Sequence, residues 1–404
     1  MSSNVVTVIE VGTTRTVVLV GRARAGAPPE VLGVGVQPTT GMRKGRVDTA
    51  EYVRTAVATA LGKANDAART DVRDVSLICS CGDVRSETLR AEAPVQDPSG
   101  CVTEATVAAA RDALERAAVV PDGRDPFDVL RLGHSLDGDP SEVREPVGMS
   151  ARVLAVNGLL IHGAQTPIER LEDVVCDTGC GVNYLIFSGM AAALGALTRQ
   201  QREDGALCID FGGGTTSWCA YRHRYPVAAG ALPIGGDHVT NDLLSAFSPG
   251  SQSSAERFKI ASCQAVLRGI GRDERVELHP DRGDPRRTVS RYAAAQVVNA
   301  RMDELLRLVR DDLKRSGVLG HLGAGVVICG GGARLAGLPE LVSSVFRVPC
   351  SLPSLSTGRP ELDRDPLGFA TAWGGLQQAV RKDEAERART ASRSLASRFK
   401  RLFE

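Results

Sequence analysis

The chain has 404 residues, more than one hydrophobic core usually organises, so we expect two or three domains. Hydrophobic residues make up 43% and charged residues 24%, which is the balance of a soluble globular protein. The formal net charge of +1 argues against a chain built to bind nucleic acid. The last dozen residues differ from the rest because they are strongly basic.

The ten cysteines are scattered, and Cys79–Cys81 and Cys176–Cys180 are the only near pairs. Neither pair has a second pair at zinc-site spacing, so we interpret the cysteines as small buried hydrophobic residues of a reducing compartment. The start lacks the basic region of a signal peptide, and no apolar run reaches the roughly 18 residues of a spanning helix. The sequence therefore predicts a cytosolic protein.

Taken in chain order, the elements suggest an α/β protein interrupted by an insertion. Apolar alternation predicts strands, and Thr49 is the candidate N-cap of the first helix. The first part (1–81) holds strands 5–11, 16–21, 31–37 and 75–79 and helix 50–68. A polar block with many Gly and Pro residues (82–165) holds helix 104–118 and strands 127–132 and 151–161. The earlier pattern then resumes over 166–209, with helices 168–178 and 189–201 and strands 183–187 and 207–211.

The remainder predicts a second lobe over 210–380. Strand-like segments "SWCAY" and "PVAAGALPIGG" come first, and a largely helical region over 237–311 follows, interrupted by the charged turn "HPDRGDPRR". The segment "GVVICGGGARLAGLPEL" then predicts a strand, a glycine turn and a helix. Residues 381–391 are charged and predict a linker, and residues 392–404 predict a terminal amphipathic helix.

Two distant segments share one pattern. Both "VTVIEVGTTRTVVLVG" and "ALCIDFGGGTTSWCAY" are an apolar strand, an acidic residue, a glycine turn with hydroxyl residues and a second apolar strand. Such a repeat implies two like-folded halves that face each other across a cleft.

Each turn has the composition of a phosphate loop. Glycines let backbone N–H groups converge on a phosphate, threonine hydroxyls add donors, and an acidic residue at the strand end can hold Mg²⁺ through water. A single hairpin of this kind is more often only a tight turn, but the repeat favours a clamp on one polyphosphate. The residues concerned are Glu10, Gly12, Thr13 and Thr14 from one half and Asp210, Gly212, Gly213, Gly214, Thr215 and Thr216 from the other.

Other nucleotide motifs fit less well. No Walker P-loop sequence is present, and "GGGARLAGL" lies too late in the chain, with a second hairpin before it, for a Rossmann dinucleotide site. Gly331 and Gly332 instead suit the wall against which a nucleoside lies. Glu256 and Lys259, spaced i, i+3 on one helix face, are either ribose ligands or an ordinary surface ion pair.

Five further blocks make a specific pattern with the hairpins: "GMRKGRVDT", "EPVGMSA", "LPIGGDHVTNDL", "AERFKI" and "VVICGGGARLAGLPELVSSVF". In this order, and over nearly the whole chain, the sequence resembles the FtsA family of bacterial cell-division proteins, within the actin-like ATPase superfamily. The resemblance implies an α/β, actin-like (ribonuclease H-like) fold of two lobes around a nucleotide cleft, with a small inserted α+β subdomain over 82–165.

The resemblance also implies ATP and Mg²⁺ as cofactors. Its partners would be the C-terminal tail of the tubulin-like FtsZ, other division proteins through the inserted subdomain, further copies of the chain in protofilaments, and anionic lipid. The protein would lie at the division site, on the cytoplasmic face of the inner membrane. Carried over by position, phosphate contacts fall on Gly12, Thr13, Thr14, Gly213, Gly214, Thr215 and Thr216, magnesium near Asp210, and nucleoside contacts on Gly235, Gly236, Glu256, Lys259, Gly331 and Gly332.

The sequence departs from the family pattern at three places. Glu10 stands where the first hairpin usually has Asp, Ser217 stands where the second usually ends in an acidic residue, and residues 188–201 contain no carboxylate to activate water. Hydrolysis needs an oriented water as well as bound charge. Our hypothesis is that the protein binds ATP and hydrolyses it slowly or not at all.

The terminal segment has a helical pattern typical of a membrane interface. At 100° per residue, its apolar residues fall within an arc of about 100°, and basic residues occupy the remainder. A basic amphipathic helix also suits a partner protein, but the charged approach before it favours the membrane. The apolar set is Leu395, Phe399, Leu402 and Phe403, and the basic set is Arg393, Arg398, Lys400 and Arg401.

Two other functions share the expected fold. A sugar-kinase-type phosphotransferase needs a general base beside the phosphates, and we find no convincing Asp there. An actin-like pilus-assembly adaptor shares the inserted subdomain but lacks a basic amphipathic C-terminus. The terminal segment and "GMRKGRVDT" argue against both.

Overall fold

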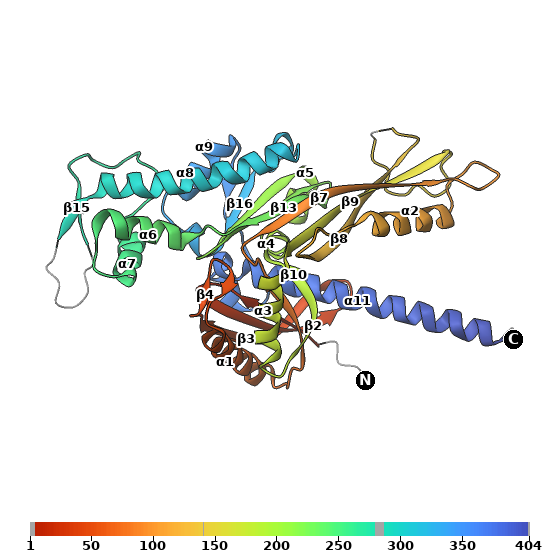
Figure 1. The fold of residues 1–404 in the computed structure, drawn as a ribbon, viewed down its shortest axis with the longest axis horizontal. Coiled ribbons are helices and arrows are strands. Elements are labelled where there is room, and N and C mark those ends of the chain that lie inside the picture. Colours follow the sequence, from red (N-terminus) through yellow and green to blue (C-terminus); the bar gives the residue numbers. More distant parts are fainter. Residues whose placement is uncertain (1–4, 140, 279–286, 403–404) are drawn as a thin grey trace.

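The computed structural model describes residues 5–139, 141–278 and 287–402, with side chains described as far as residue 387. Two lobes lie one above the other in Figure 1, and a third unit projects to one side. The expected α/β, two-lobed architecture with a small insertion is confirmed.

The two lobes are built on sheets of the same design. The lower sheet has the order β10-β6-β1-β2-β3, and the upper sheet begins with the matching order β17-β16-β11-β12-β13. In each, a central strand pairs antiparallel with the next strand of its hairpin and parallel with a later one. The lower strands are β1 (Val5–Val11), β2 (Arg15–Arg24), β3 (Ala27–Pro38), β6 (Asp74–Cys79) and β10 (Gly181–Phe187), and the upper ones β11 (Ala206–Phe211), β12 (Thr216–Arg222), β13 (Tyr225–Leu232), β16 (Val326–Cys329) and β17 (Cys350–Ser351).

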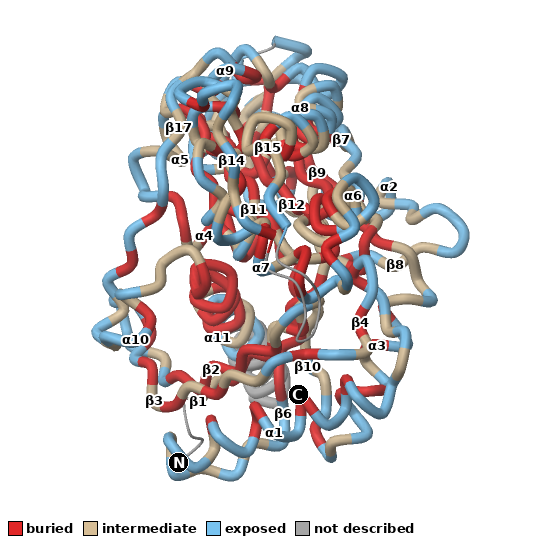
Figure 2. Tube along the Cα trace, turned by 90° about the vertical axis from the view of Figure 1, so that its left-hand side faces the viewer, coloured by how far each residue is buried: buried red, intermediate tan, exposed pale blue. Residues whose placement is uncertain are grey.

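Helices cover both faces of the lower sheet, which explains why β1 and β2 are continuous apolar runs rather than alternating ones. Helix α1 (Ala50–Ala68) packs closely on β3, where a Cβ at Gly35 would lie 1.9 Å from the Ala60 carbonyl oxygen. On the other face, α11 (Pro366–Leu402) crosses α4 (Ser188–Ala196), and a Cβ at Gly374 would lie 1.9 Å from the Ala191 carbonyl oxygen. The early part of α11 is buried at the centre of the molecule (Figure 2).

Two predicted segments, a helix and a linker, differ in the structure. The predicted helix 189–201 is two helices, α4 and α5 (Arg199–Asp204), because Leu197 is extended and the Thr198 side chain caps the second helix. The predicted linker over 381–391 is instead a continuation of α11, which runs unbroken to Leu402. Alanine and charged residues of high helix propensity fill this segment, without Gly or Pro, so charge alone gave no reason to end the helix.

The inserted unit is a sheet with one helix, built from β7 (Val84–Pro94), β8 (Arg124–Leu136), β9 (Val153–Ala164) and α2 (Glu104–Ala117). The predicted helix and the two predicted strands are present, although both strands are longer than expected. Strand β7 was not predicted, because it alternates polar residues with few large apolar ones. It joins the insertion to the edge of the upper sheet through the pair Ala231↔Val84.

The predicted helical region 237–311 contains α6 (Gly236–Phe247), α7 (Gln252–Ser262) and α8 (Arg291–Arg315). It also contains an unpredicted two-stranded sheet of β14 (Arg275–Glu277) and β15 (Thr288–Ser290). Most of the predicted charged turn lies outside the described residues. Remaining short elements are β4 (Met42–Arg43), β5 (Arg46–Val47), α3 (Gln165–Cys176), α9 (Leu338–Phe346), α10 (Pro360–Asp363) and the 3₁₀ turns η1 (Leu319–His321) and η2 (Gly331–Arg334).

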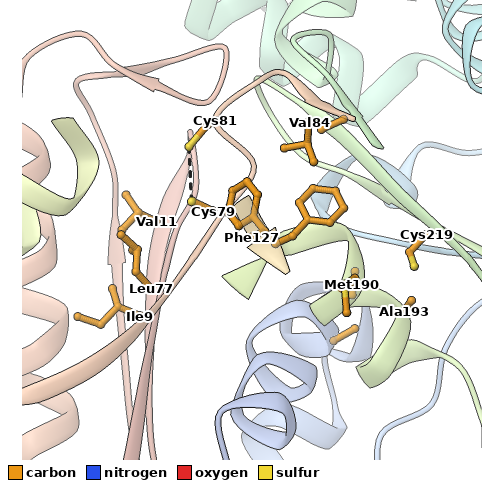
Figure 3. Close-up of a cluster of buried hydrophobic side chains, with 14 of the residues drawn as sticks. Ile9, Val11, Leu77, Cys79, Cys81, Val84, Phe127, Met190, Ala193 and Cys219 are labelled. Atoms are coloured by element: carbon orange, nitrogen blue, oxygen red, sulfur yellow. Dashed lines mark hydrogen bonds between the residues drawn. The ribbon is translucent and has the colours of Figure 1, made fainter. Parts of the chain in front are cut away.

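A core of apolar side chains joins the lobes and the insertion. Figure 3 shows Ile9, Val11 and Leu77 of the lower sheet on one side and Phe127, Met190 and Ala193 on the other. Cysteines are part of this core, since Cys79, Cys81 and Cys219 are buried among these side chains. Seven of the ten cysteines are buried, which agrees with their interpretation as small hydrophobic residues, whereas Cys176 is exposed. Within the described part of the chain, no helix is both long and apolar enough to cross a bilayer.

Candidate functional site

The first hairpin, β1–β2, turns at Gly12. Its N–H donates to the Arg15 carbonyl oxygen at 3.0 Å, and a Cβ at this position would lie 2.8 Å from that oxygen. Only glycine therefore fits the turn without a backbone shift. Thr13 and Thr14 form its tip, directly after Gly12, and Glu10 lies two residues before that glycine, near the end of β1.

The second hairpin, β11–β12, repeats this geometry. The Gly212 N–H donates to the Thr215 carbonyl oxygen at 2.9 Å, and a Cβ at Gly212 would lie 2.9 Å from the same oxygen. Because both turns use one glycine and one hydrogen bond in the same way, the sequence repeat corresponds to a repeat of backbone structure.

The two turns, one from each lobe, face each other. A Cβ at Gly213 would lie 2.6 Å from the Thr14 methyl carbon, and one at Gly214 would lie 2.5 Å from the Thr13 hydroxyl oxygen. Between and below the tips is a cavity of about 280 Å³. Of the predicted phosphate residues, the wall includes Gly12, Thr13, Thr14, Gly212, Gly213 and Thr215. Gly214 lies at the contact between the tips, and Thr216 is buried in β12.

Glu10 and Asp210, the two predicted magnesium carboxylates, are the only acidic residues in the described cavity wall. Asp210 accepts a hydrogen bond from the Thr371 hydroxyl at 2.9 Å, whereas Glu10 Oε2 is buried without a partner among the described residues. Burial, opposed by the charge of Arg15 and reinforced by Asp210, raises the pKa of Glu10 from 4.5 to about 7. Burial also raises the pKa of Asp210, against the effect of the Thr371 hydrogen bond.

Both raised pKa values have the same main cause, burial of the carboxyl group away from water, which the charge of Arg15 offsets only in part. No three His, Cys, Asp or Glu side chains in the described residues gather closely enough to hold a metal ion on their own. The two carboxylates therefore suit a cation that takes its other ligands from phosphate oxygens and water. The unpartnered Glu10 oxygen and the open glycine turns fit a nucleotide phosphate with its Mg²⁺.

Arg15 is a wall residue that sequence reasoning missed. Its guanidinium donates to the Gly368 carbonyl oxygen, lies 3.9 Å from Asp365 and stacks 5.3 Å above the Phe369 ring centroid. It is the first residue of β2, and its partners lie about 350 positions later in the chain, so no local signal identified it. On the same side, Arg334 forms an ion pair with Asp365 at 2.5 Å. Both arginines add positive charge to the cavity wall.

The block "GMRKGRVDT" forms the hairpin β4–β5, whose turn also reaches the cavity. Lys44 and Gly45 both have positive φ, and a Cβ at Gly45 would lie 2.7 Å from the Thr215 methyl carbon. Gly45 and Ser80 are wall residues, and the Ser80 hydroxyl donates to the Thr215 hydroxyl at 3.1 Å. The sequence alone marked this block only by resemblance, without assigning it a place.

The predicted nucleoside residues separate into two groups. Gly331 and its neighbour Gly330 line the cavity, whereas Gly332 packs against Phe211. Gly235 and Gly236 lie outside the wall but directly behind the second turn, because the Gly236 N–H donates to the Gly212 carbonyl oxygen at 3.0 Å.

Lys259 and Glu256 are also outside the wall and form an ion pair of 2.6 Å. The Lys259 ammonium group in addition donates to the Gly236 carbonyl oxygen at 3.1 Å and to the Thr240 hydroxyl at 2.9 Å. The pair thus supports the start of α6, the helix that follows the second turn. Contact of these four residues with a nucleoside stays a prediction.

Two of the departures from the family pattern meet in the wall. The Ser217 hydroxyl and the Ser188 hydroxyl are hydrogen-bonded at 2.9 Å, at the base of β12 and the start of α4. Neither serine can take a proton from water at neutral pH. Ser217, which stands where an acidic residue was expected, and Ser188, at the start of the segment without a carboxylate, therefore form a neutral, hydrogen-bonded pair.

Two sheets of equal strand order, each contributing a glycine hairpin to one shared cavity, define an actin-like protein. Comparison with solved structures agrees. The "PilM-PilN type IV pilus biogenesis complex" aligns with a TM-score of 0.59 at 18% identity, over 93% of this chain and 98% of that one. MreB5 of Spiroplasma citri, in a structure bound to AMPPNP, aligns with a TM-score of 0.56 at 13% identity, over 96% and 99%. At these identities the likeness shows the fold alone.

Sequence comparison is more specific. A family model described as "Cell division protein FtsA" matches residues 207–374, and one described as "SHS2 domain inserted in FTSA" matches residues 81–162. The cell division protein FtsA of Pseudomonas aeruginosa is 30% identical over 384 residues, which cover 94% of this chain and 90% of that protein. The chain belongs to the FtsA family, and the resemblance drawn from the sequence blocks is confirmed. It is a cell-division protein of actin-like fold.

Proposed function

We propose that this protein binds ATP with Mg²⁺ between its two glycine hairpins and serves as the membrane-attached adaptor of the FtsZ ring. The observation that carries the proposal is the pair of turns with the same backbone geometry, facing each other across one cavity. A polyphosphate between them accepts hydrogen bonds from both lobes at once, so it favours the closed arrangement of the lobes.

The division of roles in the cleft follows from its wall. Backbone N–H groups near Gly12 and Gly213 hold phosphate, with Thr13, Thr14 and Thr215 as hydroxyl donors. Glu10 and Asp210 hold the Mg²⁺ that balances the phosphate charge. Gly330 and Gly331 form the side against which the nucleoside lies. That an actin-like neighbour was solved with AMPPNP supports this assignment.

ATP serves as an assembly ligand and is hydrolysed slowly or not at all. Among the described residues, the cavity wall offers no carboxylate beyond Glu10 and Asp210, and both are adjacent to the phosphate turns. The Ser188–Ser217 pair occupies the region where a water-activating acid would act. A phosphate-release assay on lipid vesicles tests this point, and sustained release faster than about one per second, within the range of typical enzymes, would contradict it.

The C-terminal end of α11 attaches the protein to the membrane. The helix is continuous to Leu402 and projects away from the body in Figure 1. The predicted apolar and basic residues from Leu395 onward lie where side chains are outside the described part, and Phe403 lies beyond the described residues. The assignment therefore rests on their sequence pattern: an apolar stripe flanked by cations suits an anionic membrane surface.

Co-sedimentation with vesicles containing anionic lipid tests the attachment. Phe399→Glu places a charge in the predicted apolar arc, and we expect it to lower the bound fraction strongly. Ser397→Glu is the matched control, because the helical pattern assigns position 397 to the opposite face. Equal loss in both variants would show that added charge, not the apolar stripe, weakens binding. Unchanged binding of Phe399→Glu, or of a chain lacking residues 394–404, would exclude the anchor.

Binding of the FtsZ C-terminal tail, contacts of the insertion with other division proteins and assembly into protofilaments complete the proposal, and membership of the FtsA family supports them. Fluorescence anisotropy with a labelled FtsZ tail peptide tests the first, and ATP-dependent sedimentation on lipid tests assembly. An absence of saturable peptide binding would exclude the adaptor role even if ATP binds.

A further inference from the structure

A second cavity, of about 590 Å³, lies where several parts of the molecule meet. Its wall comes from α4, α5, the β12–β13 hairpin, strand β8 of the insertion and the middle of α11. It shares no wall residue with the cleft between the hairpins. This separation makes it a site of its own rather than an extension of the phosphate cleft.

The wall of the second cavity is strongly cationic. Its described residues include four arginines and one lysine but a single carboxylate, that of Asp128, which pairs with Lys382 at 3.1 Å. Arg224 pairs with Glu203, which is not part of the wall. Among the described residues, the side chains of Arg199, Arg202 and Arg381 have no hydrogen-bond or ion-pair partner.

The arrangement keeps like charges close together. Arg202 is half-buried, and burial lowers the pKa of its guanidinium; the charges of Arg381, Arg199 and Arg224 lower it further, against the opposing effect of Tyr221. Cations that have no anionic partner repel one another and lose solvation. The cost is relieved when an anion enters the cavity and each guanidinium gains an acceptor.

The inner part of the cavity is apolar except for one polar atom that has no hydrogen-bond partner among the described residues. Met190, Leu194 and Tyr221 are buried wall residues. Gln378 is only 8% exposed, and its Oε1 is buried with no hydrogen-bond partner among the described residues. A buried acceptor of this kind costs free energy until a donor reaches it. The inner part therefore suits an apolar group that carries a hydroxyl or other donor.

We propose that this cavity is a second ligand site, for a small phosphate-bearing molecule with an apolar group, held by Arg199, Arg202 and Arg381 at the phosphate and by Gln378 at a donor group. Arginine forks match the oxygens of a phosphate in pairs, and the apolar inner wall accommodates the rest of the ligand. The phosphate comes either from a lipid headgroup or from a soluble phosphate, and the test below separates these sources.

Calorimetric titration of the full chain tests the site. Excess ADP and Mg²⁺ are present so that the hairpin cleft is occupied and does not contribute to the measured binding. The probes are dihexanoyl phosphatidic acid below its micellar concentration, inorganic pyrophosphate, and dihexanoyl phosphatidylcholine as a probe without net charge. We expect the double variant Arg202→Gln/Arg381→Gln to bind phosphatidic acid about tenfold or more weakly, because charge-assisted hydrogen bonds are lost. The matched control, Arg54→Gln/Arg116→Gln, removes two exposed arginines far from the cavity and should bind as the unaltered chain does.

Each result of these titrations either supports or excludes the second ligand site. Loss of phosphatidic acid binding alone identifies a lipid headgroup, and loss of both phosphate probes identifies the phosphate group itself; either supports the site. Equal affinities in the double variant and its control overturn it, as does phosphatidylcholine binding as tight as that of phosphatidic acid, or no saturable binding of either phosphate probe. Arg381→Gln alone, at an exposed position, gives the same comparison if the double variant has a lowered melting temperature.

Discussion

The hairpins β1–β2 and β11–β12 are nearly identical in backbone and different in their acidic residues. Each turns on a glycine whose N–H bonds the carbonyl oxygen three residues later. Asp210 in the second is fixed by Thr371, whereas Glu10 in the first is one methylene longer and leaves a buried oxygen without a partner. The similar backbones suit the binding of one ligand by both turns. The two different carboxyl groups suit unequal contributions to binding of the cation.

The comparison shows which positions of the repeat must keep the same residue type and which can vary. A turn with glycine at its first position tolerates no Cβ, so both halves retain it. The acidic residue only has to bring a carboxylate to the cavity, and side-chain length is adjustable there. If the two turns hold one polyphosphate, equivalent changes in the two halves should have equivalent effects, and changes in the two acids should not.

The largest effect should come from the turn glycines. In Gly12→Ala and Gly212→Ala the new Cβ meets a backbone oxygen at 2.8 and 2.9 Å, so each turn must open and its N–H groups lose their alignment. We expect each to weaken ATP binding roughly a hundredfold, equal to about 3 kcal/mol. Equilibrium binding of a fluorescent ATP analogue measures this.

Gly62→Ala is the control for these changes, because Gly62 lies within helix α1 with no atom within 4 Å of its Cβ position. It should leave binding unchanged and raise stability by about 0.5–1 kcal/mol, since alanine is the better helix residue. A large loss in only one of the two turn variants would contradict the clamp.

The pH dependence of stability should distinguish the two acids. The pKa of Glu10 is about 7 in the folded protein and 4.5 when unfolded, so between these values the folded state holds a proton that the unfolded chain has lost. The free energy of unfolding of the nucleotide-free protein must therefore fall as pH rises from about 4.5 to 7, and then level off.

Because Glu10 faces a cleft open to solvent, we expect this loss to reach about 2 kcal/mol, less than the full shift would give. Denaturant titrations from pH 4.5 to 8 measure it. Glu10→Gln should remove most of the slope, and Asp210→Asn a smaller part, since burial raises that pKa as well. A steeper slope in Glu10→Gln than in the unaltered chain would show that the Glu10 carboxyl is not the group responsible.

The strengthening of ATP binding by Mg²⁺ should depend on the two acidic residues in the opposite order, more on Asp210 than on Glu10. Asp210 is held in place by Thr371, so Asp210→Asn removes a preorganised oxygen, and we expect Mg²⁺ to strengthen ATP binding about tenfold less in this variant. Glu10→Gln should lose less, because its carboxylate must give up a proton before it can face the cation. ATP titrations with Mg²⁺ and with EDTA give the ratio. Equal losses would mean that both acids contribute alike.

The features that sequence predicted are those encoded locally. The turn glycines, the strand ends at Glu10 and Asp210 and the repeat that joins them occupy short segments, and most of the predicted hairpin residues line the cavity. Arg15 was missed because its partners, Phe369 in the first turn of α11 and Asp365 just before that helix, lie far along the chain, and nothing near Arg15 signals them. Residues 381–391 have two sequence features with opposite implications. Their charges suggested a linker, but their helix propensity and their packing on Tyr184 and Asp128 continue α11 instead.

The smallest effect should come from the hydrogen-bonded serine pair in the cavity wall. Ser188 and Ser217 are buried and hydrogen-bonded to each other at 2.9 Å. Removing either hydroxyl leaves the other unsatisfied, so Ser188→Ala and Ser217→Ala should each lower the free energy of unfolding by about 1 kcal/mol. In the double variant both polar groups are gone, and its loss should be smaller than the sum of the single losses. Denaturant titrations of the three variants measure this coupling. Additive losses would show that the serines act separately, and ATP affinity should change little in all three because the phosphate turns are intact.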